Sequence, residues 1–152
     1  MNVAYVATTS SKPLITLWIP GEKFYSMSAK ATPAAIQLCI KWGGPKCQRL
    51  FSAGIDMVIH AWQIVGSHME YMMSSDMRHV SRDIAREMSR VTSASDEVYH
   101  TKWITDLLPI PDMNMIASAS IDSNMCLWEM STLKGKSLHK DGHKHAIYSL
   151  EW

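Results

Sequence analysis

The sequence predicts an all-β protein built from repeated hairpins, and three stretches carry this prediction. They are YVATTSSKPLITLW at Tyr5–Trp18, RLFSAGIDMVIHAW at Arg49–Trp62 and MIASASIDSNMCLW at Met115–Trp128. Each has a short apolar run ending in small hydroxyl residues, then a polar turn, then a second apolar run that closes on tryptophan. Apolar runs separated by turn residues are typical of β-hairpins. The chain therefore contains the same hairpin three times.

A common register supports the repetition. A hydroxyl residue stands ten positions before each tryptophan, at Thr8, Ser52 and Ser118. A polar turn residue stands six positions before it, at Lys12, Asp56 and Asp122. The tryptophans lie 44 and 66 residues apart, and repeats of four strands have periods of roughly 40–45 residues. The second interval is therefore one period plus an insertion.

Composition describes an ordinary globular chain and narrows the classes of partner. The 152 residues are 47% hydrophobic and 19% charged, enough for a sizeable core. The formal net charge of +1 provides no overall attraction to nucleic acid or an anionic membrane. Cys39, Cys47 and Cys126 form no close pair, which favours free thiols over disulfides. No secretory signal or long apolar run is present, so we expect a cytoplasmic protein.

Strands are expected in order along the chain, which begins inside a repeat. Residues 4–9, 14–19 and 24–27 read as strands, followed by a loop over 28–33. The apolar segments QLCIKW (37–42) and ITDLLP (104–109) precede the second and third hairpins, and IYSLEW (147–152) repeats their pattern. We expect a first unit over 1–33, a second over 34–66, a third over 96–142, and the first strand of another over 143–152.

Residues 67–95 interrupt this order and are expected to form an insertion, either helical or disordered. Apolar residues recur at helical spacing, namely Met77, Val80, Ile84, Met88 and Val91. Arginines four residues apart share one face of such a helix, namely Arg78, Arg82, Arg86 and Arg90. These arginines form a candidate surface for an acidic partner such as a tubulin tail, and Met72 and Met73 are candidates for apolar contacts with a neighbouring protein. The alternative is a solvated face, balanced by Asp83 and Glu87.

This pattern resembles the WD-repeat β-propeller family, in which four-stranded blades surround a central channel. The resemblance implies part of a propeller, with about two fairly complete blades, partial blades at both ends and the inserted segment. The family's hydrogen-bonded tetrad corresponds here to His100, Ser118, Asp122 and Trp128. The second copy supplies Ser52, Asp56 and Trp62 without a matching histidine, and the first supplies Thr8 and Trp18. Linking these groups satisfies buried donors and acceptors.

The resemblance also implies a function. His100 with ITDLL, then IASASIDS and GHKHAIYSLEW, are similar to large WD-repeat proteins of cilia and flagella, some of which carry EF-hands. We therefore expect a non-enzymatic scaffold in a microtubule-associated axonemal assembly, whose partners are further blades, assembly subunits, tubulin or axonemal proteins. The alternative is a cytosolic adaptor that recognises a peptide or degron. A subunit of an enzyme complex ranks last.

No catalytic, cofactor-binding or metal-binding residues are expected. The histidines of HKDGHKH, at 139, 143 and 145, resemble zinc ligands, but His143 also fits the tetrad histidine of a following blade. Turn and tetrad roles account for Asp56 and Asp122, so a catalytic pair of carboxylates is not favoured. Cys39 and Cys126 fall inside expected strands, where small core residues are more common than nucleophiles.

Overall fold

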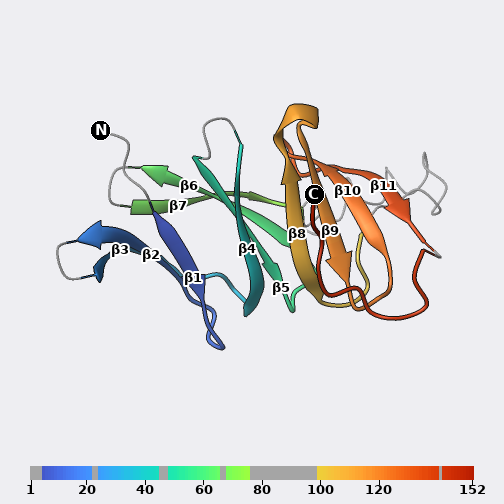
Figure 1. The fold of residues 1–152 in the computed structure, drawn as a ribbon, viewed down its shortest axis with the longest axis horizontal. Coiled ribbons are helices and arrows are strands. Elements are labelled where there is room, and N and C mark those ends of the chain that lie inside the picture. Colours follow the sequence, from blue (N-terminus) through green and yellow to red (C-terminus); the bar gives the residue numbers. More distant parts are fainter. Residues whose placement is uncertain (1–4, 22–23, 45–47, 66–67, 76–98, 141) are drawn as a thin grey trace, which may run out of the picture.

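The computed structural model describes residues 5–21, 24–44, 48–65, 68–75, 99–140 and 142–152. These residues form three antiparallel sheets that lie one after another along the molecule (Figure 1). Two of the sheets have four strands and the first has three. The all-β prediction, with four-stranded antiparallel units, is therefore confirmed.

Each sheet is a meander in which every strand pairs with the next strand along the chain. The first sheet contains β1 (Val6–Thr9), β2 (Ile15–Gly21) and β3 (Phe24–Ala31). The second contains β4 (Gln37–Gly43), β5 (Arg49–Gly54), β6 (Ile59–Val65) and β7 (His68–Ser74). The third contains β8 (Ile104–Ile110), β9 (Met115–Ser120), β10 (Met125–Glu129) and β11 (Gly135–His139). A short 3₁₀ helix, Pro111–Met113, joins β8 to β9.

The three repeated hairpins are confirmed as β1–β2, β5–β6 and β9–β10. They share a register, because the hydroxyl residue always faces the residue two positions before the tryptophan. These facing pairs are Thr8 with Thr16, Ser52 with His60, and Ser118 with Cys126. The side chains of residues two apart lie on the same face of a strand. Each tryptophan therefore lies diagonally across from its hydroxyl, on one face of the sheet.

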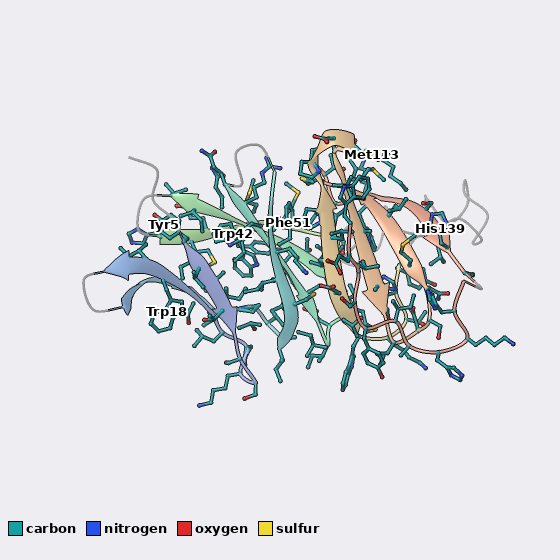
Figure 2. The ribbon with its side chains drawn as sticks, viewed as in Figure 1. Tyr5, Trp18, Trp42, Phe51, Met113 and His139 are labelled. Carbon is teal, nitrogen blue, oxygen red and sulfur yellow. The ribbon has the colours of Figure 1, made fainter. Side chains whose placement is uncertain are left out.

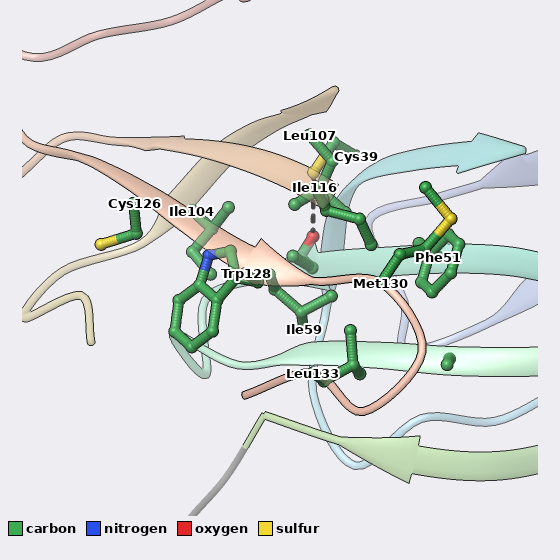
Figure 3. Packing of buried hydrophobic residues seen from close by; sticks show 12 residues of the cluster. Cys39, Phe51, Ile59, Ile104, Leu107, Ile116, Cys126, Trp128, Met130 and Leu133 are labelled. Carbon is green, nitrogen blue, oxygen red and sulfur yellow. Dashed lines mark hydrogen bonds between the residues drawn. The ribbon is translucent and has the colours of Figure 1, made fainter. Parts of the chain in front are cut away.

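The core fills the two spaces between neighbouring sheets. β1 lies beside β4, and β8 lies beside β4 and β5. Successive side chains of β5 point to opposite faces of the sheet. Leu50 therefore packs in the cluster shared with the first sheet, and Phe51 packs in the cluster shared with the third sheet. Figure 3 shows the second cluster, where Phe51 and Ile59 meet Trp128 and Met130. Within the second sheet, β5 is buried on both faces, with five of its six residues buried, whereas β7 at the edge has no buried residue.

The insertion begins later than expected. The prediction that it starts at residue 67 is wrong, because His68–Ser74 forms β7, which pairs with β6 and completes the second sheet. β6 needs a partner for its second backbone edge, and methionine adapts to strand packing as readily as to a helix. Met72 and Met73 are partly buried against the core instead of forming an open surface. The expected helix, with Arg78, Arg82, Arg86 and Arg90, lies outside the described residues.

Two further expectations about strands are wrong. The predicted loop over 28–33 begins too early, because β3 continues to Ala31 in antiparallel pairing with β2. The last segment, 147–152, is not a strand among the described residues. A strand requires a neighbouring strand with which to form its ladder, and side chains of the third sheet hold this segment instead. The Ile147 carbonyl accepts a hydrogen bond from Thr105 Oγ1 at 2.6 Å, for example.

Gly54 provides a test of the packing at the start of β4. A Cβ atom on Gly54 would lie 2.1 Å from the Ile36 carbonyl oxygen and 2.8 Å from Gln37 Cα. These are backbone atoms that cannot rotate away, so Gly54→Ala should destabilise the protein by about 1–3 kcal/mol. Gly142→Ala is the control, because nothing lies within 4 Å of its Cβ position. Urea unfolding measures both, and equal midpoints for the two variants would contradict the described packing.

Candidate functional site

Four polar residues of the third sheet form a buried chain of hydrogen bonds. Trp128 Nε1 on β10 donates to Ser118 Oγ on β9 at 2.7 Å. Ser118 Oγ lies 2.7 Å from Nε2 of His100, which comes from the segment before β8. His100 Nδ1 lies 3.1 Å from Oδ2 of Asp122 in the β9–β10 turn. The structure thus brings together all four residues named from the sequence for this copy.

The carboxylate fixes the direction of every bond in this chain. An ionised carboxylate only accepts, so the proton of the imidazole lies on His100 Nδ1. Nε2 then accepts from the Ser118 hydroxyl, whose oxygen accepts from the indole N–H of Trp128. Burial lowers the pKa of His100, and the neighbouring Asp122 offsets this only in part. The imidazole is therefore neutral at pH 7, as the chain of bonds requires.

Asp122 ties the β9–β10 turn to the segment before β8. Its carboxylate accepts the backbone N–H of Thr101 at 2.8 Å and that of Asn124 at 2.9 Å. Burial raises the pKa of Asp122, but these two donors and His100 together outweigh burial, so the pKa lies below its ordinary value. A stable carboxylate here holds two loops of the third sheet together.

The second sheet forms a related but different arrangement. Trp62 Nε1 donates to Ser52 Oγ at 2.9 Å, as in the third sheet. Asp56 Oδ2 lies 2.7 Å from Nε2 of His60, which belongs to β6. Sequence analysis found no matching histidine for this copy and missed His60, which lies on the strand. The signal that could have found it is a histidine two positions before Trp62.

His60 and Cys126 occupy equivalent positions, each facing the hydroxyl residue of its hairpin. In the third sheet, Cys126 Sγ lies only 3.9 Å from His100 Nδ1. The small cysteine leaves room for the imidazole that arrives from the loop. In the second sheet the strand itself supplies the imidazole, which reaches Asp56 directly. The two sheets therefore pair the turn carboxylate with histidine by two different routes.

Among its described residues, the first sheet has only the bond between tryptophan and hydroxyl, from Trp18 Nε1 to Thr8 Oγ1 at 2.9 Å. Thr16 stands where the other sheets have His60 or Cys126. The second sheet is also less fully bonded than the third. Among the described residues, Asp56 Oδ1 and His60 Nδ1 are buried without a hydrogen-bond partner. The completeness of the polar chain thus differs from sheet to sheet.

Asp106 is a buried carboxylate that sequence reasoning did not single out as a link between units. Its Oδ1 forms an ion pair with Lys41 Nζ on β4 at 3.1 Å, and its Oδ2 accepts the backbone N–H of Leu150 at 2.9 Å. Asp106 itself lies on β8, so it joins the second sheet, the third sheet and the last segment. A charged residue inside the apolar run ITDLLP was the available signal.

The cysteines and histidines considered for catalysis or metal binding lie in surroundings typical of structural residues. Cys39 and Cys126 are buried in β4 and β10, as predicted, and burial raises the pKa of each thiol to about 12. Thiols with such pKa values are poor nucleophiles. His139 on β11 hydrogen bonds to Ser137, while His143 and His145 are exposed. The part of the chain that the structure describes contains no group of three or more potential metal ligands.

Comparison with protein-family models and with curated proteins finds no match for this chain. In the described ranges, no helix has the length and apolar character needed to cross a membrane.

The neutral state of His100 predicts a dependence of stability on pH. Its pKa in the folded protein lies below the ordinary value of 6.5, so the unfolded chain takes up a proton first as the pH falls. The stability contributed by the neutral imidazole is present above pH 6.5 and is lost as the pH falls below it. The lowered pKa of Asp122 acts in the same direction at more acidic pH.

We expect the free energy of unfolding in urea to fall by up to about 1.4 kcal/mol per pH unit between pH 6.5 and pH 5 through His100. His100→Gln is the control, since glutamine retains polar atoms but does not titrate. The slope should be shallower in this variant. An identical slope in the two proteins would show that His100 does not carry the effect.

Proposed function

We propose that this chain is a segment of a WD-repeat β-propeller that acts as a non-enzymatic scaffold for contacts between proteins. Three features support the propeller. Consecutive sheets share one strand order, they pack face to face, and each contains a bond between tryptophan and hydroxyl. Closed propellers typically have 4–8 blades, so further blades come from the same polypeptide or from a partner.

The observation that carries the scaffold proposal is the exposure of large apolar side chains. Tyr148 is 74% exposed, Trp152 86% and Trp103 50%, whereas the tryptophans that fill the core are nearly inaccessible. Tyrosine and tryptophan are enriched where proteins meet, because one side chain supplies both apolar area and a polar tip. Exposed aromatic residues of this size favour a surface that another protein covers.

Two of these residues belong to one end of the third sheet. The Trp103 carbonyl accepts the backbone N–H of Ile121 in the β9–β10 turn, at 3.2 Å. Ile147, the neighbour of Tyr148, donates its backbone N–H to the Ser120 carbonyl at 3.1 Å. In Figure 1 this is the lower end, where the β1–β2, β5–β6 and β9–β10 turns all lie. Trp103 and Tyr148 therefore form the centre of a proposed contact surface.

We assign the scaffold to a ciliary or flagellar assembly, with tubulin or other axonemal proteins as partners. The support for this assignment is the sequence resemblance around residues 100–108, 116–123 and 142–152. A cytosolic adaptor that binds a peptide or degron is the alternative, since exposed aromatic residues beside Lys102 suit an acidic peptide as well. The two proposals differ in where the protein acts and in what it binds.

The test expresses the tagged full chain in ciliated cells and identifies its cross-linked partners by mass spectrometry. We expect axonemal proteins to be enriched. The double variant Trp103→Ser/Tyr148→Ser should reduce that enrichment about tenfold, because a few aromatic residues supply most of the binding energy at many interfaces. Met113→Ser is the matched control, because Met113 is also exposed, at 64%, and lies at the opposite end of the third sheet in Figure 2. Equal enrichment for both variants would contradict the proposed surface.

A further inference from the structure

Two short exposed segments at the lower end of the third sheet carry basic side chains. The first contains Lys102 and Trp103 and leads into β8. The second, residues 142–145, follows β11 and contains Lys144 between two histidines. All of these side chains are exposed, and lysine carries a positive charge at neutral pH. The two segments therefore present positive charge to solvent beside an aromatic ring.

Ser120 brings the two segments together. Its Oγ donates to the Lys102 carbonyl, and its own carbonyl accepts the backbone N–H of Ile147, both at 3.1 Å. Figure 1 shows the chain after β11 running along the lower end of the third sheet. Lys144 comes three residues before Ile147, so its Cα lies within about 10 Å of that residue. Both lysines thus belong to the contact surface proposed around Trp103.

The carboxylates of the neighbouring hairpin turns are used by the fold itself. Asp122 in the β9–β10 turn lies against His100 and accepts two backbone N–H groups, and its side chain is 3% exposed. Asp56 in the β5–β6 turn is bonded to His60, and its side chain is 18% exposed. Neither turn offers an open carboxylate to a partner. The side chains that a partner can contact beside these turns are therefore basic and aromatic.

We propose that this surface binds an acidic segment of a partner protein, whose glutamate or aspartate side chains pair with Lys102 and Lys144 while an apolar residue packs on Trp103. The inference rests on the proposed scaffold function, because it names the chemistry of the partner at the same surface. Opposite charges across an interface guide encounter and select partners, and tryptophan supplies apolar contact area. Pairs of exposed charges are individually weak, so the affinity should fall as salt is added.

Binding of labelled probes to the full chain tests the charge of the partner. The probes are a fluorescein-labelled oligoglutamate peptide, an oligoglutamine peptide of the same length, and an oligothymidylate with the same number of charges, each followed by fluorescence anisotropy. We expect the oligoglutamate to bind most tightly and to be released by salt. Oligoglutamate binding no better than oligoglutamine would overturn the proposal. Equal or tighter binding of the oligothymidylate would also overturn it, because any polyanion would then be accepted.

Charge reversal at single lysines tests the location. Lys102→Glu and Lys144→Glu should each weaken oligoglutamate binding about fivefold, because an attraction becomes a repulsion. Lys12→Glu is the matched control, since it changes the net charge equally and lies exposed in the β1–β2 turn, with the second sheet between it and the third (Figure 1). Equal weakening by all three variants would overturn the proposal, because net charge alone would then explain the binding.

The cross-linking experiment in ciliated cells separates failure of this inference from failure of the proposed function. We expect Lys102→Glu to lower partner enrichment, as Trp103→Ser/Tyr148→Ser does. If the aromatic variant lowers the enrichment and Lys102→Glu leaves it unchanged, the contact surface stands and its acidic partner is contradicted. If the aromatic variant leaves the enrichment unchanged, the contact surface itself is contradicted.

Discussion

The hydrogen bond from a tryptophan indole to a hydroxyl ten residues earlier is the interaction on which the structure depends. It occurs in all three sheets, at 2.9 Å in the first and second and 2.7 Å in the third. A large ring can fill the space between two sheets only if its N–H finds an acceptor, because an unpaired buried donor costs about 1–3 kcal/mol. The hydroxyl supplies that acceptor without adding volume. In the second and third sheets the hairpin thus joins its own strands while its tryptophan fills the space beside the neighbouring sheet, whereas the bond in the first sheet is exposed.

The carboxylate of the hairpin turn needs a partner as well, and the protein meets this need in two ways. In the third sheet the partner is a histidine from a loop, His100, and the facing strand position is the small Cys126. In the second sheet the partner is His60 on the strand itself. The histidine from the loop connects the segment before β8 with β9 and the β9–β10 turn, and every polar atom in this chain of hydrogen bonds has a partner. The strand route ties the turn only to the adjacent strand, so the second sheet relies more on the apolar packing on both of its faces.

The hairpins could be predicted from sequence because their spacing is fixed by local geometry, whereas the four residues of the third-sheet chain, His100 included, were expected from the family resemblance. A ten-residue separation and a turn residue six positions before tryptophan follow from one hairpin register, whatever surrounds it. The fourth strand β7 and the partner of Asp56 could not be predicted in this way. β7 is set by the unpaired edge of β6, and its methionines have no strong local preference. The linking role of Asp106 was missed for the same reason, because its contacts are with Lys41 and Leu150, both distant in sequence.

The rate of hydrogen exchange at the tryptophan indoles tests the central claim most directly. The chain has six tryptophans, and Trp62 and Trp128 are buried donors whereas Trp103 and Trp152 are largely exposed. In ¹H–¹⁵N spectra after transfer to D₂O, the account predicts that the indole signals of Trp62 and Trp128 persist at least about tenfold longer than those of Trp103 and Trp152. Equally rapid loss of all these signals would contradict the account, because it would mean that no indole is held by a stable bond within a folded hairpin.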